Sequence, residues 1–266
     1  MEIRYIDAHC HLQFEQYAQD RESVIEQMRE QGIAGIVVGC DLETSRQAVE
    51  LAEKHEHLYA SVGLHPNHAE QESFAFEAYR ALAMHPKVVA IGECGLDFFR
   101  PESQTSDAIK KQKELFSQHV VLAGTLNKPL IIHARQSLGT QDAYHEVIAI
   151  LKEAKQNYPN LRGDVHFFAG GVKEAEVFIV LGFTVSFTAV ITFSRDYDIV
   201  LRAVPLTNML VETDAPYVAP ITRRGKRNDP LAVIDVVTKI AEIRGEDLEI
   251  VRATILATTK HLFALD

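Results

Sequence analysis

Two histidines flank a cysteine near the start of the chain, in the segment YIDAHCHL that covers residues 5–12. A thiolate favours a closed structural zinc site, whereas imidazoles with carboxylates suit an open catalytic metal site. Alternate side chains of a strand face opposite sides, so we expect His9 and His11 on one face and Cys10 on the other. Asp7 would share the histidine face one step deeper, where a carboxylate can orient an imidazole. The segment predicts half of a metal site, without the cysteine.

Further side chains of this chemistry lie at or near the ends of apolar runs elsewhere in the chain. They are His65, Glu93, His133, His166 and Asp214. A buried cluster of such groups with nothing to compensate its charge would cost several kcal/mol, on the order of the burial of unpaired ions. Their convergence would therefore indicate a metal. The remaining histidines fall on helices or loops, where surface or capping roles are expected: His55, His57, His68, His85, His119, His145 and His261.

The elements that would position these side chains repeat one unit, a short β-branched run followed by a loop and an amphipathic helix. Eight runs are expected to be strands: residues 4–9, 33–39, 58–64, 88–93, 129–133, 164–168, 184–189 and 209–213. Most are almost wholly apolar, as parallel strands covered on both faces are. Helices are expected between the strands, then over residues 231–243 and, as an extra C-terminal helix, over 247–265.

Eight such alternations without a linker predict an α/β fold of one domain over residues 1–266, a (β/α)₈ TIM barrel. The alternative is an open doubly wound sheet, which would place a glycine-rich turn after the first strand. The turn here holds His-Cys-His and no glycine, and the chain has neither a GxGxxG nor a Walker A segment. In a parallel barrel all strand C-termini open on one face, so the seven side chains would meet there.

Composition narrows the class of protein further. The net charge is 27 − 37 = −10, which argues against a protein that coats nucleic acid but allows an enzyme with a local basic loop. Cys10, Cys40 and Cys94 form no CxxC pair, and the N-terminus has no signal-peptide pattern, so we expect a cytoplasmic protein. Residues 177–194 carry no charge, yet a glycine and period-two polar residues favour a helix end, a turn and a strand over a membrane span.

Seven motifs occur in order along nearly the whole chain: DAHCHL, GLHP (63–66), IGECGLDFFR (91–100), PLIIHAR (129–135), HFFAGG (166–171), ETDAPY (212–217) and GKRNDP (225–230). Together they resemble the motifs of the TatD family of metal-dependent deoxyribonucleases, within the amidohydrolase-like superfamily. The resemblance implies a TIM barrel with two divalent metal ions. The residues alone leave the metal open among Zn, Mn, Fe and Mg.

The resemblance also implies roles for individual residues. His9, His11 and Asp214 would hold one ion, His133 and His166 the other, and Glu93 would bridge both. His65 would line the pocket and contact the scissile phosphate. In such a two-metal reaction Asp214 could also accept the proton of the attacking water. Glu212 shares the face of Asp214 but lies deeper, so a supporting role is expected for it.

Candidate substrate contacts come from basic and aromatic residues near the strand ends. Arg135 could bind phosphate or form an ordinary surface ion pair. The loop after the eighth strand carries four basic residues, of which Arg224, Lys226 and Arg227 could clamp a nucleic-acid backbone; a solvated basic turn is the alternative. Phe98, Phe99 and Tyr217 could stack on a base, although packing is the alternative for the two phenylalanines.

Three functions remain open from the sequence. The first is a deoxyribonuclease acting on DNA ends, with 3′-to-5′ cleavage of single strands as the mode that the resemblance implies. The second is a hydrolase with the same metal site that cleaves an amide or ester bond in place of a phosphodiester, such as a lactonase or an aminoacyl-tRNA deacylase. The third, a scaffold or nucleic-acid-binding module without catalysis, conflicts with the complete set of ligands and the net charge. DNA is the expected partner, and no obligate protein partner or membrane is expected.

Overall fold

A barrel of eight parallel strands forms the centre of the computed structural model, which describes residues 1–69 and 72–265. The strands pair in chain order, each with the next. They are β1 (Tyr5–Cys10), β2 (Ile33–Val38), β3 (Leu58–Val62), β4 (Val88–Asp97), β5 (Leu130–Arg135), β6 (Gly163–His166), β7 (Phe183–Phe187) and β8 (Met209–Val211). Two backbone hydrogen bonds join the end of β1 to the segment that follows β8, from the His11 N–H to Ala215 and from the Asp214 N–H to His9. The predicted (β/α)₈ barrel is confirmed.

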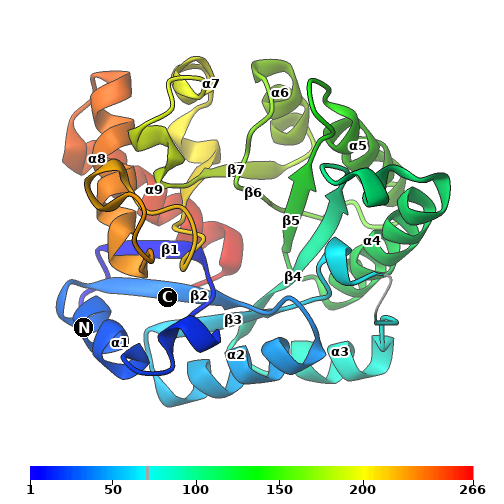
Figure 1. The fold of residues 1–266 in the computed structure, drawn as a ribbon, viewed down its shortest axis with the longest axis horizontal. Helices are drawn as coiled ribbons and strands as arrows, with labels where there is room; N and C mark the ends of the chain where they lie inside the picture. The colour runs from blue at the N-terminus through cyan, green and yellow to red at the C-terminus, as the bar shows by residue number, and fades with distance from the viewer. Residues whose placement is uncertain (70–71, 266) are drawn as a thin grey trace.

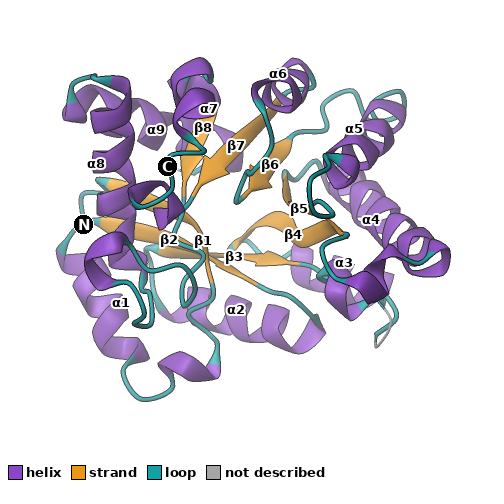
Figure 2. Ribbon diagram, turned by 45° about the horizontal axis from the view of Figure 1, so that its top comes forward, coloured by secondary structure: helices purple, strands orange, loops and turns teal. Residues whose placement is uncertain are grey.

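Helices surround the strands on the outside, as Figures 1 and 2 show. They are α1 (Arg21–Glu30), α2 (Leu42–Lys54), α3 (Phe76–Ala83), α4 (Ser106–Leu126), α5 (Asp142–Ala154), α6 (Val172–Val180), α7 (Asp198–Ala203), α8 (Val233–Arg244) and α9 (Leu248–Phe263). The predicted extra helix at the C-terminus is α9. Its Leu262 and Phe263 pack with Ala8, Ile36 and Leu210 in a small cluster of strand residues, so the end of the chain helps to fill the barrel interior.

Two strand boundaries differ from the sequence prediction in ways that affect the site. Strand β4 runs on to Asp97, four residues beyond the predicted end at Glu93, because glycines interrupt the apolar run without ending the strand. Strand β8 ends at Val211, so Asp214 lies in the loop that follows. The uncharged stretch 177–194 divides into the end of α6, a turn and β7. Among the described residues, no helix is long and apolar enough to cross a membrane.

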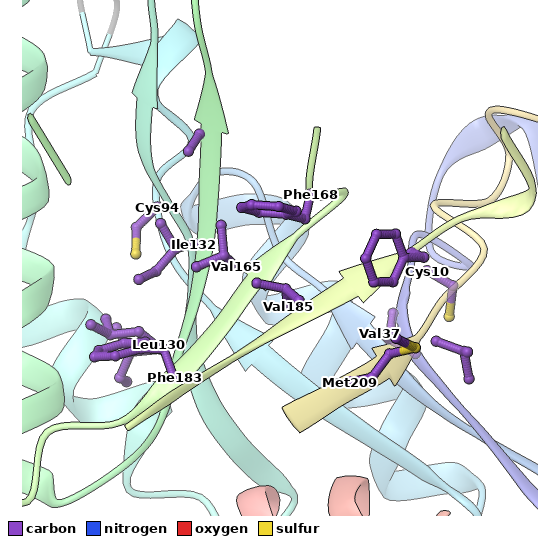
Figure 3. Packing of buried hydrophobic residues seen from close by; sticks show 14 of the residues in the cluster. Cys10, Val37, Cys94, Leu130, Ile132, Val165, Phe168, Phe183, Val185 and Met209 are labelled. Atoms are coloured by element: carbon purple, nitrogen blue, oxygen red, sulfur yellow. The ribbon is translucent and has the colours of Figure 1, made fainter. Parts of the chain in front are cut away.

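The larger hydrophobic core fills the space between the barrel and its helices. Cys10 lies in this core, fully buried, and pairs in register with Val37 of β2. Figure 3 shows Cys10, Val37 and Cys94 among the side chains of this cluster. The expectation that Cys10 points away from the histidine face is therefore confirmed.

His119 contradicts the expectation of a surface or capping role. It is 0% exposed on α4, and both ring nitrogens are hydrogen-bonded: Nδ1 to the carbonyl oxygen of Leu115 at 2.9 Å, and Nε2 as acceptor of the Leu64 N–H at 2.9 Å. His57 is also buried, with Nε2 3.3 Å from the carbonyl oxygen of Ile25. An imidazole can be buried at such positions because the backbone supplies its hydrogen-bond partners.

Candidate metal centre

Glu93 lies at the centre of the histidines that the sequence singles out. Its Oε1 is 3.0 Å from Nδ1 of His133, 3.2 Å from Nε2 of His166 and 3.4 Å from Nε2 of His65. Its Oε2 is 3.5 Å from Nε2 of His9. Four imidazoles from four different parts of the chain thus surround one carboxylate that is 3% exposed.

The backbone of β4 explains how Glu93 reaches this position. Gly92 and Gly95 have φ values of 150° and 138°, and residues that have a Cβ rarely adopt such values. A Cβ on Gly95 would lie 2.0 Å from the carbonyl oxygen of His133, and one on Gly92 would lie 2.4 Å from that of Ile131. The register with β5 shifts between Ile91 and Cys94. The motif IGECG therefore builds an irregular strand that presses close to β5 and aims Glu93 inward.

The seam between β1 and β8 brings the remaining expected ligands together. Nε2 of His11 is 3.1 Å from Nε2 of His9 and 3.4 Å from Oδ1 of Asp214. Asp214 has a φ of 51°, and Phe167, which follows His166, has a φ of 47°. For a non-glycine residue, the left-handed conformation with positive φ costs on the order of 1–3 kcal/mol, and residues held in it cluster at functional sites. Asp214 is of a type that tolerates the conformation, which turns its carboxylate toward the histidines.

Asp7 does not orient an imidazole as expected. Its Oδ1 accepts the backbone N–H groups of Thr213 at 2.9 Å and of His9 at 3.2 Å, and its Oδ2 accepts the Thr213 hydroxyl at 2.5 Å. The register of β1 with β2 shifts between Asp7 and Cys10, so strict alternation does not continue from His9 to Asp7. The carboxylate instead joins β1 to the segment after β8.

The outward nitrogens of three histidines are each held by a defined acceptor. Nδ1 of His11 is 2.9 Å from the carbonyl oxygen of Val38. Nε2 of His133 is 3.1 Å from Oδ2 of Asp97, and Nδ1 of His166 is 3.0 Å from Oε1 of Glu212. Since these oxygens can only accept, the outward nitrogens carry hydrogens. The opposite nitrogens face Glu93 or Asp214, and on a neutral ring they would offer a lone pair to a metal ion placed between them.

His65 differs from these histidines in the direction of its hydrogen. Its Nδ1 accepts the backbone N–H of Asn67 at 3.1 Å, so the hydrogen of the neutral ring lies on Nε2. Burial lowers the pKa of His65, which keeps the ring neutral. His65 therefore presents an N–H donor to Glu93 and the cavity, and in this tautomer its Nε2 has no lone pair for a metal ion.

Sequence reasoning missed two residues of the site. Asp97 lies beyond the predicted end of its strand, although it is 1% exposed and bonded to His133. The Cys40 thiol lies 3.7 Å from Nδ1 of His11 and 3.6 Å from Oε2 of Glu93. The acidic residue in GLDFF was a signal for the first, because its run of strand-forming residues continues past Glu93. For Cys40 the signal was its position at the end of β2.

The electrostatics of the cluster are those of a cation site. Burial raises the pKa of Glu93, but the surrounding His65, His166 and His9 outweigh it and hold that pKa well below its usual value. Burial lowers the pKa of His166, yet Glu212 and Glu93 outweigh it and raise that pKa well above the ordinary value. Glu93 is thus ionised, and a positive charge is stabilised beside it.

Within the described part of the chain, three sets of side chains bring possible ligand atoms within 4.8 Å of one another: His9, His11 and Glu93; His9, His166 and Glu212; and His65, Glu93 and His133. Mixed imidazole and carboxylate donors suit Zn²⁺ and related divalent ions. The residues present fit a metal ion.

A cavity of about 940 Å³ opens above this cluster. Arg135 and Arg100 line it, and the Arg135 guanidinium lies 3.8 Å from the ring centre of Phe99. Phe99 is 44% exposed and Tyr217 49%, whereas Phe98 is buried at 2%. Two of the three aromatic candidates are therefore accessible, and Phe98 belongs to the core.

The residues that line this cavity do not include the basic loop after β8, so its expected contacts with a nucleic-acid backbone stay a prediction. Arg227 forms two hydrogen bonds to the Asp20 carboxylate, at 2.6 and 2.8 Å. The Arg224 guanidinium lies 4.4 Å from the ring centre of Phe193, and Lys226 is exposed. The basic residues of this loop made it a candidate for substrate binding. Two of its side chains instead pair or stack with residues that are distant in the sequence.

Comparison with known proteins identifies the family. The profile of the TatD related DNases matches residues 6–264. The chain belongs to the TatD family.

Curated relatives span essentially the whole chain. The "Uncharacterized metal-dependent hydrolase YabD" of Bacillus subtilis is 35% identical, and the match covers 98% of this chain and 99% of that protein. The "3'-5' ssDNA/RNA exonuclease TatD" of Erwinia amylovora is 34% identical, covering 94% and 96%. Among solved structures, the TatD homolog YjjV of Escherichia coli K12 has a TM-score of 0.90 and 29% identity, covering 100% of both chains. The protein is therefore a TatD-type metal-dependent hydrolase acting on ester bonds.

Proposed function

We propose that the protein is a 3′-to-5′ exodeoxyribonuclease that removes nucleotides from single-stranded DNA ends with two divalent ions, Zn, Mn or Mg. The observation that carries the proposal is the ring of four imidazoles around Glu93 beneath a cavity with exposed cations and aromatics. The name of the Erwinia relative supports both the polarity and a single-stranded substrate. The whole chain, residues 1–266, acts as one domain in the cytoplasm without an obligate protein partner.

The residues divide into two ion positions. His9, His11 and Asp214 would hold one ion, His133 and His166 would hold the other, and Glu93 would be shared between them. When bound, such a pair of ions supplies an activated water and neutralises charge on the phosphoryl oxygens. Glu93 is suited to the bridge because each of its oxygens already faces imidazoles of a different position, Oε2 toward His9 and Oε1 toward His133 and His166.

Asp214 accepts the proton from the attacking water. Burial raises the pKa of this carboxyl, but its bond to His11 and the nearby His166 and His9 outweigh burial and lower the pKa. The group is therefore ionised at neutral pH, as a proton acceptor must be. Its place beside His11, 3.4 Å away, puts it next to the reacting centre.

His65, Arg135 and Arg100 bind the substrate. The Nε2–H of His65 donates to a phosphoryl oxygen, a contact that its tautomer allows and that a lone pair would not. The Arg135 and Arg100 guanidinium groups contact the phosphate backbone, and Phe99 and Tyr217 stack on unpaired bases, which single strands expose. Stacking of Arg135 on Phe99 holds the pair as one surface.

A labelled oligonucleotide tests the proposal. Metal-free protein is supplied with Mg²⁺, Mn²⁺ or Zn²⁺ and given 5′-labelled single-stranded DNA and RNA, with His133→Ala as the matched variant. A ladder of progressively shorter labelled products, abolished by chelator and in the variant, is the expected result. Release of the labelled 5′ nucleotide first would reverse the polarity. Intact DNA with all three metals, or equal cleavage by the variant, would contradict the proposal. Turnover of a lactone or an aminoacyl ester instead would favour the other hydrolase class.

A further inference from the structure

The two proposed ion positions differ in how their histidines are supported from behind. The position of His133 and His166 has carboxylates behind both rings, Asp97 at 3.1 Å and Glu212 at 3.0 Å. At the other position, His11 donates to the carbonyl oxygen of Val38. Nδ1 of His9 is buried without a hydrogen-bond partner among the described residues.

The difference in support correlates with the number of side-chain ligands that each ion position has in addition to the shared Glu93. His9, His11 and Asp214 supply three side chains besides the shared Glu93, whereas His133 and His166 supply two. A carboxylate behind an imidazole fixes the ring orientation and tautomer and raises the basicity of the ligating nitrogen. Carboxylate support thus occurs at the position that has fewer ligands.

Both supporting carboxylates are themselves held in place. Oδ1 of Asp97 accepts the Phe99 N–H at 3.0 Å, and the Asp97 backbone exchanges two hydrogen bonds with the Gln112 side chain, at 2.8 and 3.0 Å. Glu212 accepts the Phe167 N–H at 2.7 Å and the Ser186 hydroxyl at 2.8 Å. Neither carboxylate can turn away from its histidine without breaking these bonds, which makes each a rigid support.

We propose that Asp97 and Glu212 are positioning residues that enable the His133 and His166 position to hold its ion, and that loss of either carboxylate empties this position alone. The proposal rests on the two-ion site proposed above. Asp97 fixes the hydrogen of His133 on Nε2 and leaves the lone pair on Nδ1. Glu212 does the converse for His166, leaving the lone pair on Nε2.

Metal stoichiometry tests the proposal without reference to activity. Metal-free protein is titrated with Co²⁺ or Mn²⁺ by calorimetry, and the ions retained after dialysis are counted by mass spectrometry. Wild type should retain two ions per chain. Asp97→Asn and Glu212→Gln should each retain one, with affinity at the affected position weakened about 10- to 100-fold. Excess Mn²⁺ should refill it, so the maximal rate of Asp97→Asn should return toward that of wild type while His133→Ala stays inactive.

Asp229→Asn is the matched control, because Asp229 is a partly buried carboxylate that accepts hydrogen bonds from Arg223 at 2.7 Å and from the Leu231 N–H at 3.2 Å, with no histidine among its partners; it should retain two ions. Circular dichroism of the metal-free variants checks that they fold. If Asp97→Asn fails to fold, the ion count of Glu212→Gln tests the proposal in its place. Two ions of unchanged affinity in both variants, or equal loss in Asp229→Asn, would overturn the proposal. Wild type that binds two ions without cutting DNA would leave it standing and overturn the nuclease function; wild type that binds fewer than two would overturn both.

Discussion

The thiol of Cys40 donates to Oε2 of Glu93 over 3.6 Å and lines the same cavity as the histidines. Cys10 and Cys94 are 0% exposed, so Cys40 is the thiol that a maleimide can reach in the folded protein. Burial, together with the negative charges of Glu93 and Asp214, raises the pKa of this thiol, and the thiolate is the reactive form. Labelling should therefore be slow at neutral pH and stop at one adduct per chain, located by peptide mass spectrometry on Cys40. The labelled protein should lose metal, because the adduct fills the space beside His11 and Glu93.

Cys40→Ser is the control for this labelling. The hydroxyl keeps the size of the side chain but does not react, so the variant should retain its metal and stay unlabelled under the same conditions. First labelling at Cys10 or Cys94 would show that the barrel opens more readily than its buried core suggests.

The opposite orientations of Cys10 and its neighbouring histidines give a second prediction. Cys10→Ala should leave the metal content unchanged, because the thiol lies in the core between barrel and helices. The substitution should lower the free energy of unfolding by about 0.5–3 kcal/mol, the usual loss for a core substitution. His9→Ala and His11→Ala each remove a nitrogen that faces Glu93 or Asp214, so both should lose an ion and all nuclease activity. Metal analysis and urea unfolding check the two results, and loss of metal from Cys10→Ala would contradict the orientation.

Substituting two arginines in different surroundings would distinguish a role in substrate binding from a role in surface ion pairing. Arg135 lines the cavity, whereas Arg227 is paired with Asp20. Arg135→Ala should lower kcat/KM on single-stranded DNA about 10- to 100-fold, as loss of a charged hydrogen bond does, mostly through KM. Arg227→Ala should leave kcat/KM within about twofold and reduce stability by at most about 1 kcal/mol. A larger kinetic effect of Arg227→Ala would return the basic loop to the substrate path.

Much of the fold and of the ligand cluster could be predicted because it depends on local patterns. Apolar runs separated by amphipathic helices predicted the barrel, and a barrel necessarily gathers the ends of its strands on one face. His9, His133 and His166 could be placed because each lies in an apolar run near its end. The sequence pattern therefore located groups that lie as far apart in the chain as His9 and His166.

The features that could not be predicted depend on contacts between distant segments. The glycines beside Glu93 suggested an end to β4, yet they allow close packing on β5 and carry the strand on to Asp97. The basic loop has a clear charge pattern, but the partner of Arg227 lies 207 residues earlier at Asp20. The register shift in β1 redirects Asp7 in the same way. Sequence periodicity contains no information on such partners.

His119 gives the last prediction, which concerns stability and not the metal. Burial lowers its pKa from 6.5 to about 4, against a smaller opposite effect of its bond to Leu115. Between these values the unfolded chain binds a proton that the folded chain excludes, so the free energy of unfolding falls as pH drops through this window. The loss from this group is about 2 kcal/mol at pH 5 and absent above pH 7.

His119→Gln isolates this contribution, because an amide can accept the Leu64 N–H but does not titrate. Urea unfolding of metal-free wild type and variant at pH 7 and pH 5 measures the difference. Wild type should be the more stable of the two at pH 7, and its advantage should shrink by about 2 kcal/mol at pH 5, since only wild type contains the imidazole that resists protonation when folded. Carboxylates that titrate in the same window are common to both proteins and cancel in the comparison. An advantage that does not change with pH would mean that His119 is protonated in the folded barrel, which its two backbone hydrogen bonds, one donated and one accepted, do not permit.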